Sequence, residues 1–235
     1  MIDFTSCQEL PSSYGGSEKK RKLVYNGENY LVKFPDPVRE QKNQLSYMNN
    51  QFSEYIGCHI FESVGIPVQE TLLGIYREPG GKEKIVVACK DFTTPGCVLQ
   101  EFSSLGNETT TIEYRIKPSI EDVYAVIEAQ PTTINKPEIM AAFWDMFVID
   151  ALIANKDRHL NNWGFLCAGG QVTFSPVYDC GSSLHALLSD ERCGQLLADY
   201  TEFKNQCFNT FSAYSYNGKR INCADFFKAP IPPLE

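Results

Sequence analysis

The stretch that constrains the fold and chemistry most reads Asn155-Lys156-Asp157-Arg158-His159-Leu160-Asn161-Asn162, followed by Trp163-Gly164-Phe165-Leu166. In it Asp157 precedes Asn162 by five positions. A short loop of this kind can aim the aspartate at an acceptor hydroxyl and the amide oxygen of the asparagine at a magnesium ion on nucleotide phosphates. A lone Asp-x-x-x-x-Asn pattern is more often a turn or a helix cap than a catalytic pair. The flanking sequence is therefore needed to distinguish these possibilities.

Those surroundings have the order of a kinase catalytic loop. The run Ile139–Ile153 is apolar on most faces and predicts a buried central helix, which Asn135 starts with Pro137 and Glu138 behind it. After the loop, 163–166 and 172–174 read as a short hairpin joined by two glycines. A helix, a loop and a hairpin in this order therefore favour phosphotransfer.

Asp179 completes the pattern, in Tyr178-Asp179-Cys180-Gly181-Ser182, 22 residues after Asp157. Kinases place their second magnesium-binding aspartate after the hairpin, and Gly181 permits the backbone turn there. The sequence thus predicts an ATP- and Mg²⁺-dependent site in which Asp157 and Asn162 are catalytic and Asn162 and Asp179 bind the metal. His159 has no second His or Cys at ligand spacing, so a structural role is favoured over a base or metal ligand.

The first half of the chain offers nucleotide contacts. Leu23–Tyr25, the turn Asn26-Gly27 and Tyr30–Phe34 form a hairpin pattern that contains Lys33. Strand lysines of kinases bind the α- and β-phosphates, although alternation alone would equally allow a solvent-facing lysine. The segment Ser12–Ser17, which precedes this hairpin and contains Gly15 and Gly16, lacks the Walker pattern. Its backbone N–H groups could still approach the nucleotide phosphates. The alternative is a mobile surface loop with no role in binding.

A helix is predicted from Leu45 to Val64, ended by Gly65 and Pro67. It carries two glutamates that could orient Lys33. Glu54 flanks the apolar stripe and is preferred over Glu62 near the helix end; a solvated carboxylate is the alternative.

Strands at 71–76 and 85–89 follow, and the second part is expected to be mainly helical. Strands first and helices later indicate an α+β fold with two lobes. The predicted division is 1–88 as the first lobe, 89–93 as a hinge and 94–235 as the second lobe.

The net charge of the chain limits the classes of binding partner that are expected. The 235-residue chain has a formal charge of −8, which disfavours nucleic acids and anionic membranes as partners. The basic cluster Lys19–Lys22 is either a solvated strand or a local attraction for a nucleotide. No membrane-length apolar run or secretory signal is visible, and the odd number and scattered placement of the nine cysteines suggest reduced thiols, so we expect a cytoplasmic protein. The cysteines contain no C-x-x-C pair, which gives a zinc site no support.

Taken together, these motifs resemble those of the HipA-like kinases, most closely the compact CtkA-type branch of that family. The resemblance covers nearly the whole chain, and the stretches that carry it are Tyr30–Pro35, Phe52–Tyr55, Val68–Gly74, Ile85–Thr93, Phe143–Val148, Asp157–His159, Asn162–Leu166 and Asp179–Ser182.

The resemblance implies a two-lobed protein-kinase-like fold and transfer of phosphate to serine or threonine of a protein substrate. It makes Asp157 the base, Asn162 and Asp179 the magnesium ligands and Lys33 an ATP ligand. The backbone of Cys89, Lys90, Asp91 and Phe92 would contact adenine. Family members also suggest autophosphorylation, for which the matching serines are Ser12, Ser13 and Ser17.

The chain departs from the family at its ends. It has no room for the N-terminal subdomain of larger HipA proteins, and it stops where family members continue into further C-terminal helices. The expected partners are therefore ATP, a protein substrate and an antitoxin or a complementary C-lobe partner, and the resemblance also admits delivery to a host cell.

Other functions stay open at this point. Phosphoinositide kinases share the Asp-Arg-His-x-x-Asn loop, but their anionic headgroups need basic residues after the Asp-x-Gly turn, and 182–191 contains no Lys or Arg. A pseudokinase that only binds nucleotide or a partner is a second alternative. Transfer of the nucleotidyl group is a third.

Overall fold

The computed structural model describes residues 1–11, 19–35, 49–105, 118–131 and 134–227. The chain forms two compact units, and each is described by itself. Unit 1 comprises Met1–Phe92 and Cys180–Ser189, and unit 2 comprises Thr93–Asp179 and Asp190–Glu235. The segment Cys180–Ser189, which follows Asp179, thus belongs to the same compact unit as the N-terminal residues.

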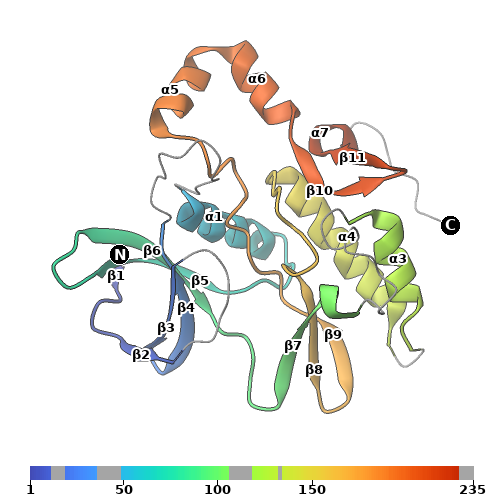
Figure 1. Ribbon diagram of the computed structural model, residues 1–235, viewed down its shortest axis with the longest axis horizontal. Coiled ribbons are helices and arrows are strands. Elements are labelled where there is room, and N and C mark those ends of the chain that lie inside the picture. Colours follow the sequence, from blue (N-terminus) through green and yellow to red (C-terminus); the bar gives the residue numbers. More distant parts are fainter. Residues whose placement is uncertain (12–18, 36–48, 106–117, 132–133, 228–235) are drawn as a thin grey trace. The chain divides into compact units, whose positions relative to one another are not determined.

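Unit 1 is built on a curled six-stranded sheet with the spatial order β1-β5-β6-β4-β3-β2 (Figure 1). Its strands are β1 (Ile2–Asp3), β2 (Gln8–Leu10), β3 (Lys20–Tyr25), β4 (Glu28–Lys33), β5 (Thr71–Arg77) and β6 (Glu83–Lys90). β1 runs parallel to β5, and all other neighbours are antiparallel.

The hairpin β3–β4 forms where the sequence predicts it. Asn26 and Gly27 have φ angles of 50° and 81°, the left-handed values that a tight two-residue turn requires. Alternate residues of β4 then face the core, so that Tyr30 and Val32 are buried together with Phe4 and Phe34. Lys33 breaks this alternation because it too is buried.

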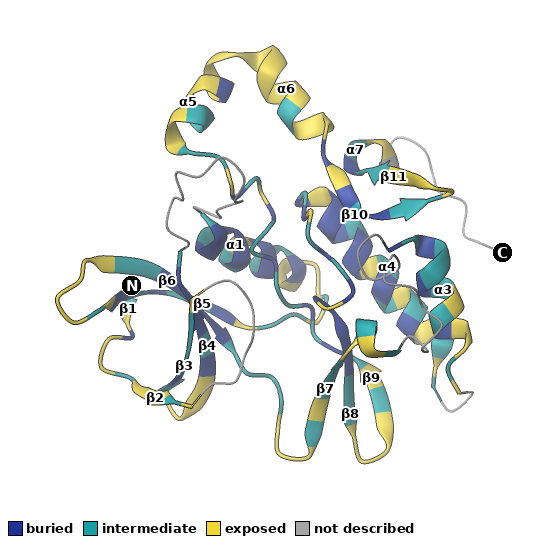
Figure 2. Cartoon of the chain, in the orientation of Figure 1, coloured by how far each residue is buried: buried dark blue, intermediate teal, exposed yellow. Residues whose placement is uncertain are grey.

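The helix α1 (Asn50–Ser63) packs on β5 and β6 of the same unit. It begins later than the predicted Leu45, with Asn49 at its N-cap, and residues 45–48 lie outside the described part of the chain. Gly65, with φ of 79°, ends it as predicted. Several turns of α1 have the dark blue colour of buried residues in Figure 2. Glu54 is among the buried residues of this helix.

Unit 2 contains more strands than the sequence suggests. The predicted hairpin β8 (Gly164–Ala168) and β9 (Gln171–Phe174) is extended by β7 (Cys97–Glu101) into a three-stranded sheet of order β7-β8-β9. A second hairpin joins β10 (Phe211–Tyr216) to β11 (Lys219–Asn222). The expectation of a mainly helical second part was therefore incomplete.

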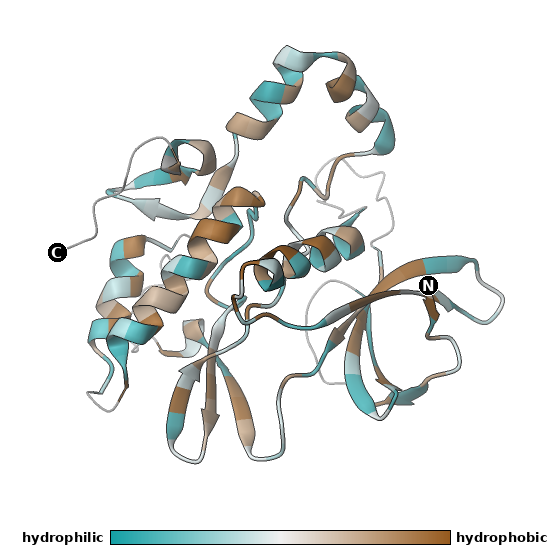
Figure 3. Cartoon of the chain, turned by 180° about the vertical axis from the view of Figure 1, so that it is seen from behind, coloured by the Kyte–Doolittle hydropathy of each residue, from teal (hydrophilic) through white to brown (hydrophobic). Residues whose placement is uncertain are grey.

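The helices of unit 2 are η1 (Phe102–Leu105, a 3-10 turn), α3 (Ile120–Glu128), α4 (Lys136–Leu152), α5 (Asp190–Ala198), α6 (Tyr200–Phe208) and α7 (Cys223–Phe226). α4 is the predicted central helix, capped by Asn135, whose side chain accepts from the Glu138 N–H. Brown, hydrophobic bands mark it in Figure 3.

The core of unit 2 is aromatic. Trp163 stacks on Phe102 with ring centroids 4.1 Å apart, and its indole N–H donates to the Tyr214 hydroxyl at 2.8 Å. Trp163 directly follows Asn162, so this contact fixes the end of loop 155–162. The β10–β11 hairpin and η1 are therefore packed around that loop.

Among the described residues, no helix is both long and apolar enough to cross a membrane. None of the nine cysteines, all of which lie in the described ranges, forms a disulfide. Cys58 and Cys180 are buried and hydrogen-bonded to each other, and this contact, with burial, raises the pKa of the Cys58 thiol.

Candidate active site

The strand lysine of unit 1 is paired with a helix glutamate. Lys33 Nζ, at the end of β4, lies 2.9 Å from Glu54 Oε2 on α1. The side chains are 8% and 1% exposed, so the ion pair is almost fully removed from water. Glu62, the alternative partner, is 71% exposed and lies near His59 instead. The structure thus brings together the two residues that the sequence favoured.

The Asp-x-Gly segment rests on the same helix. Ser183 Oγ donates to the carbonyl oxygens of Cys180 and Ser53, and the Asn49 N–H donates to the Ala186 carbonyl. A Cβ atom built on Gly181 would lie 3.0 Å from Glu54 Oε2. Gly181 therefore fits here because it lets the backbone approach the carboxylate that holds Lys33.

Gly181→Ala is expected to weaken ATP binding several-fold and to lower the free energy of unfolding by about 1–3 kcal/mol, the usual cost of overpacking. The new methyl group would press on Glu54 Oε2 and shift it by a few tenths of an ångström from its position beside Lys33. ATP titration and urea unfolding measure the two effects. Gly194→Ala in α5 is the control, because its Cβ would meet nothing within 4 Å; that change should leave ATP affinity unchanged. Equal ATP affinity in both variants would contradict the role given to Gly181.

Of the other residues predicted to bind the nucleotide, some lie outside the described part of the chain and some lie at the end of β6. Gly15 and Gly16 lie outside the described residues, as do Ser12, Ser13 and Ser17. Cys89 is a buried residue of β6. The N–H groups of Lys90 and Asp91 donate to the carbonyls of Glu70 and Asn29. These two N–H groups are therefore already used within unit 1. The predicted backbone contact of residues 89–92 with adenine would have to use other backbone groups of this segment.

The basic cluster is paired with acidic side chains of unit 1. Lys19 contacts Glu78, Arg21 Nη1 lies 2.7 Å from Glu9 Oε2, and Lys22 Nζ lies 2.9 Å from Asp91 Oδ2. These pairs support the interpretation of a solvated strand over that of an open anion site.

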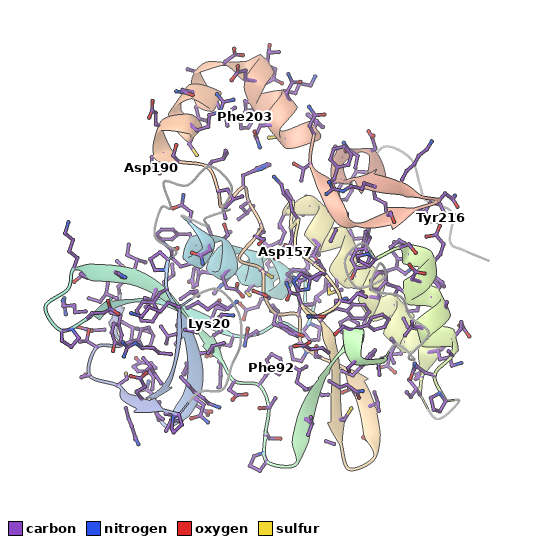
Figure 4. The ribbon with its side chains drawn as sticks, in the orientation of Figure 1. Lys20, Phe92, Asp157, Asp190, Phe203 and Tyr216 are labelled. Carbon is purple, nitrogen blue, oxygen red and sulfur yellow. The ribbon has the colours of Figure 1, made fainter. Side chains whose placement is uncertain are left out.

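In unit 2, the catalytic loop is shaped by its own hydrogen bonds. The Asn155 side chain donates to Asp150 Oδ1 and accepts from the Asp157 N–H. Asn162 Nδ2 donates to the Asp157 carbonyl at 2.8 Å. This bond orients the amide of Asn162 and directs its Oδ1 away from that carbonyl. Figure 4 labels Asp157 on the loop after α4.

A buried arginine holds this loop. Arg158 is 1% exposed; its Nε lies 2.7 Å from Asp150 Oδ2 in α4, and its Nη1 donates to the carbonyl of Asn162 at 2.6 Å. Nη1 also donates to the carbonyl of Tyr178, the residue before Asp179. Arg158 therefore joins loop 155–162 to the residue before Asp179. The sequence motif alone did not indicate this role for Arg158, although a charged residue, Asp150, inside the apolar run of α4 is a signal for a buried partner.

The electrostatics suit a proton acceptor. Burial raises the pKa of Asp157 above its ordinary value, and the negative charge of Asp179 raises it further, while His159 and Arg158 oppose this. A raised pKa makes the carboxylate a stronger base. Asp179 has a φ of 61°, a left-handed value that is uncommon for aspartate.

The donor set fits a magnesium ion. Mg²⁺ takes oxygen ligands, commonly one or two carboxylates together with substrate phosphates. Asp179 supplies a carboxylate and Asn162 an oriented amide oxygen, and a cation there would offset the repulsion between Asp157 and Asp179. No group of three or more His, Cys, Asp or Glu suited to a metal is found in the described ranges.

His159 has a local structural contact, as the sequence favoured. Its Nδ1 accepts from the Asn161 N–H at 3.2 Å, and its Nε2 lies 4.0 Å from Asp157 Oδ1. The ring therefore both orders the loop and faces the proposed base.

Asp157 also lines a pocket of about 820 Å³ in unit 2. Lys156, His159 and Asn161 line it from the catalytic loop, and Ser215 and Arg220 line it from the β10–β11 hairpin. Its volume lies within the range of ligand-binding pockets. This pocket was not anticipated from the sequence, because it depends on a hairpin that the sequence analysis had not predicted.

The family of HipA-like C-terminal domains matches residues 12–222. The serine/threonine-protein kinase CtkA of Helicobacter pylori strain J99 is 42% identical over 233 residues, 96% of this chain and 69% of CtkA. The crystal structure of a Helicobacter pylori proinflammatory kinase CtkA is similar with a TM-score of 0.84 and 40% identity, over 99% of this chain and 78% of that chain. A chain from the Shewanella oneidensis HipA, HipB and operator DNA complex gives a TM-score of 0.46 at 17% identity, over 87% of this chain and 47% of that one.

Proposed function

Because the chain belongs to the family of HipA-like C-terminal domains, we propose that it transfers the γ-phosphoryl group of ATP to a serine or threonine of a protein. The name of its relative CtkA, a serine/threonine-protein kinase, supports the reaction class. Under this proposal the fold is that of a two-lobed protein kinase, with 1–88, 89–93 and 94–235 as first lobe, hinge and second lobe.

The proposed roles divide into a nucleotide group and an acceptor residue. Lys33, positioned by Glu54, contacts the phosphates of ATP, and Asn162 and Asp179 hold magnesium, which neutralises charge on those phosphates when bound. Asp157 orients the acceptor hydroxyl and takes its proton. Cys89 to Phe92 serve adenine, and the segment with Gly15 and Gly16 serves the phosphates.

The observation that carries the proposal is the buried Arg158. Its guanidinium binds Asp150, the carbonyl of Asn162 and the carbonyl of Tyr178 at once. A turn or a helix cap needs no such cross-link. A cation that joins the loop of Asp157 to the residue before Asp179 supports a site in which both carboxylates must be held rigidly, as phosphoryl transfer requires.

Nucleotide binding can be measured as thermal stabilisation. ATP with Mg²⁺, at roughly 100 times its Kd, should raise the Tm by about 5–10 °C, since ligand binding stabilises only the folded state. Asp179→Ala should remove most of the magnesium-dependent part of that rise. Lys33→Ala should weaken ATP binding itself, because the phosphates lose a buried cation.

Lys82→Ala provides the matched control, since Lys82 is an exposed lysine of the same unit in the turn between β5 and β6. It should leave the ATP-dependent rise intact. An unchanged Tm of the wild type at millimolar ATP and Mg²⁺ would refute the proposed nucleotide binding.

A further inference from the structure

The pocket beside Asp157 has a fixed wall. The Ser215 N–H donates to the Pro118 carbonyl at 3.0 Å, and the Asn217 N–H donates to Glu121 Oε1 at 2.7 Å. These bonds attach the β10–β11 hairpin to the start of α3. On the other side, the Ser103 N–H donates to the Leu160 carbonyl at 3.0 Å, which attaches η1 to the catalytic loop. The pocket is therefore a built feature of unit 2.

The pocket is lined by more positive than negative side chains. Among the described residues that line the pocket, Lys156 and Arg220 are permanent cations, while Asp157 is the sole carboxylate. Arg220 is exposed yet held in place: its Nη2 donates to the Ser212 carbonyl at 3.3 Å, and its guanidinium lies 5.2 Å from the centroid of the Phe211 ring. Because the guanidinium is already held in one orientation, it loses little side-chain conformational entropy when its remaining N–H groups bind a ligand.

From these contacts we propose that the pocket binds the residues next to the phosphate acceptor and selects acidic ones. This inference rests on the proposed function, in which Asp157 contacts the acceptor hydroxyl. The pocket of about 820 Å³ then receives neighbouring side chains, and Lys156 and Arg220 bind their carboxylates. Because the whole chain carries a charge of −8, an acidic segment needs such local cations to dock at all.

The test compares two degenerate peptide libraries. Both have one central Ser or Thr, flanked by Glu and Ala in the first library and by Lys and Ala in the second. With the wild type, kcat/KM should be at least about fivefold higher for the Glu library, since partly exposed charge pairs contribute modestly but additively. The preference should shrink at high salt because the pairs are screened.

Arg220→Glu should shift the ratio of the two kcat/KM values by about tenfold toward the Lys library. Arg220→Gln should reduce the preference without reversing it and serves as a milder variant if the glutamate variant unfolds. Lys219→Glu is the matched control, because it makes the same charge change at the neighbouring exposed residue of β11, which does not line the pocket. It should keep the wild-type preference.

A binding experiment separates this inference from the proposed function. Fluorescence anisotropy of labelled libraries requires no phosphoryl transfer, and the wild type should bind the Glu library more tightly, with Arg220→Glu losing that preference. Transfer to both libraries with equal kcat/KM would overturn the inference and leave the kinase assignment standing. Tighter binding of the Glu library without any phosphoryl transfer would support the inferred preference of the pocket and contradict the proposed kinase function. Equal binding of both libraries overturns the inference in either case.

Discussion

Replacing Arg158 by methionine is expected to lower the free energy of unfolding by about 3–5 kcal/mol, the cost of breaking a buried ion pair by removing one partner. Arg158 is 1% exposed and Asp150 is 4% exposed. The variant leaves the Asp150 carboxylate buried without its cation and removes the donors to two backbone carbonyls. Because domains are stable by only about 5–15 kcal/mol, this loss is large. Urea unfolding followed by circular dichroism measures it.

Two further variants sharpen this prediction. Arg192→Met removes an exposed partner of Glu202, at 2.9 Å, and should cost less than about 1 kcal/mol. The double variant Arg158→Met/Asp150→Leu should recover much of the lost stability, since no unpaired charge remains buried. We expect phosphoryl transfer to be impaired in both Arg158 variants, because the bonds from Arg158 to the carbonyls of Asn162 and Tyr178 are lost in both. A loss in Arg158→Met no larger than that in Arg192→Met would contradict the structural role of this ion pair.

The sequence could predict the hairpin around Lys33 because Asn26-Gly27 permits only a narrow choice of turns. It could not choose between Glu54 and Glu62 with certainty, since both lie on one helix. Glu54 shares a buried face with Cys58 and Phe61, four and seven positions on, whereas Glu62 points away from it. The partner of Lys33 is therefore decided by the packing of α1 on the sheet.

Arg158 shows what the sequence could not reveal. The motif includes it, but an arginine in a polar loop is normally exposed. Its burial depends on Asp150, eight residues earlier in α4, and on Tyr178, twenty residues later. These residues meet only because the chain reverses at Ala154, whose φ is 56°, and returns through the β8–β9 hairpin.

The hairpin β10–β11 was missed for a different reason. Its turn, Asn217-Gly218, has positive φ angles of 49° and 70° and carries the same signal as the first hairpin. The prediction for the second part was mainly helical and did not include this turn. Since this hairpin forms one wall of the pocket, that wall of the candidate site was not predicted either.

Asp157→Asn is the second variant with a large expected effect. It preserves the shape of the side chain and removes its charge, so turnover should fall by about 10² to 10⁴, the range for a positioned base. ATP affinity should stay within about twofold, because the nucleotide is assigned to other residues. Asp145→Asn, an exposed carboxylate of α4, is the control and should keep full turnover.

The most direct measurement follows the label of radioactive ATP. Wild type and Asp157→Asn are incubated with Mg²⁺, a degenerate Ser/Thr peptide library and ATP labelled at either the α- or the γ-phosphate. We expect the wild type to transfer only the γ-label, as phosphoserine or phosphothreonine, and Asp157→Asn to transfer at least about a hundredfold less. Label from α-labelled ATP in the peptides, or γ-transfer that survives in Asp157→Asn, would contradict the account.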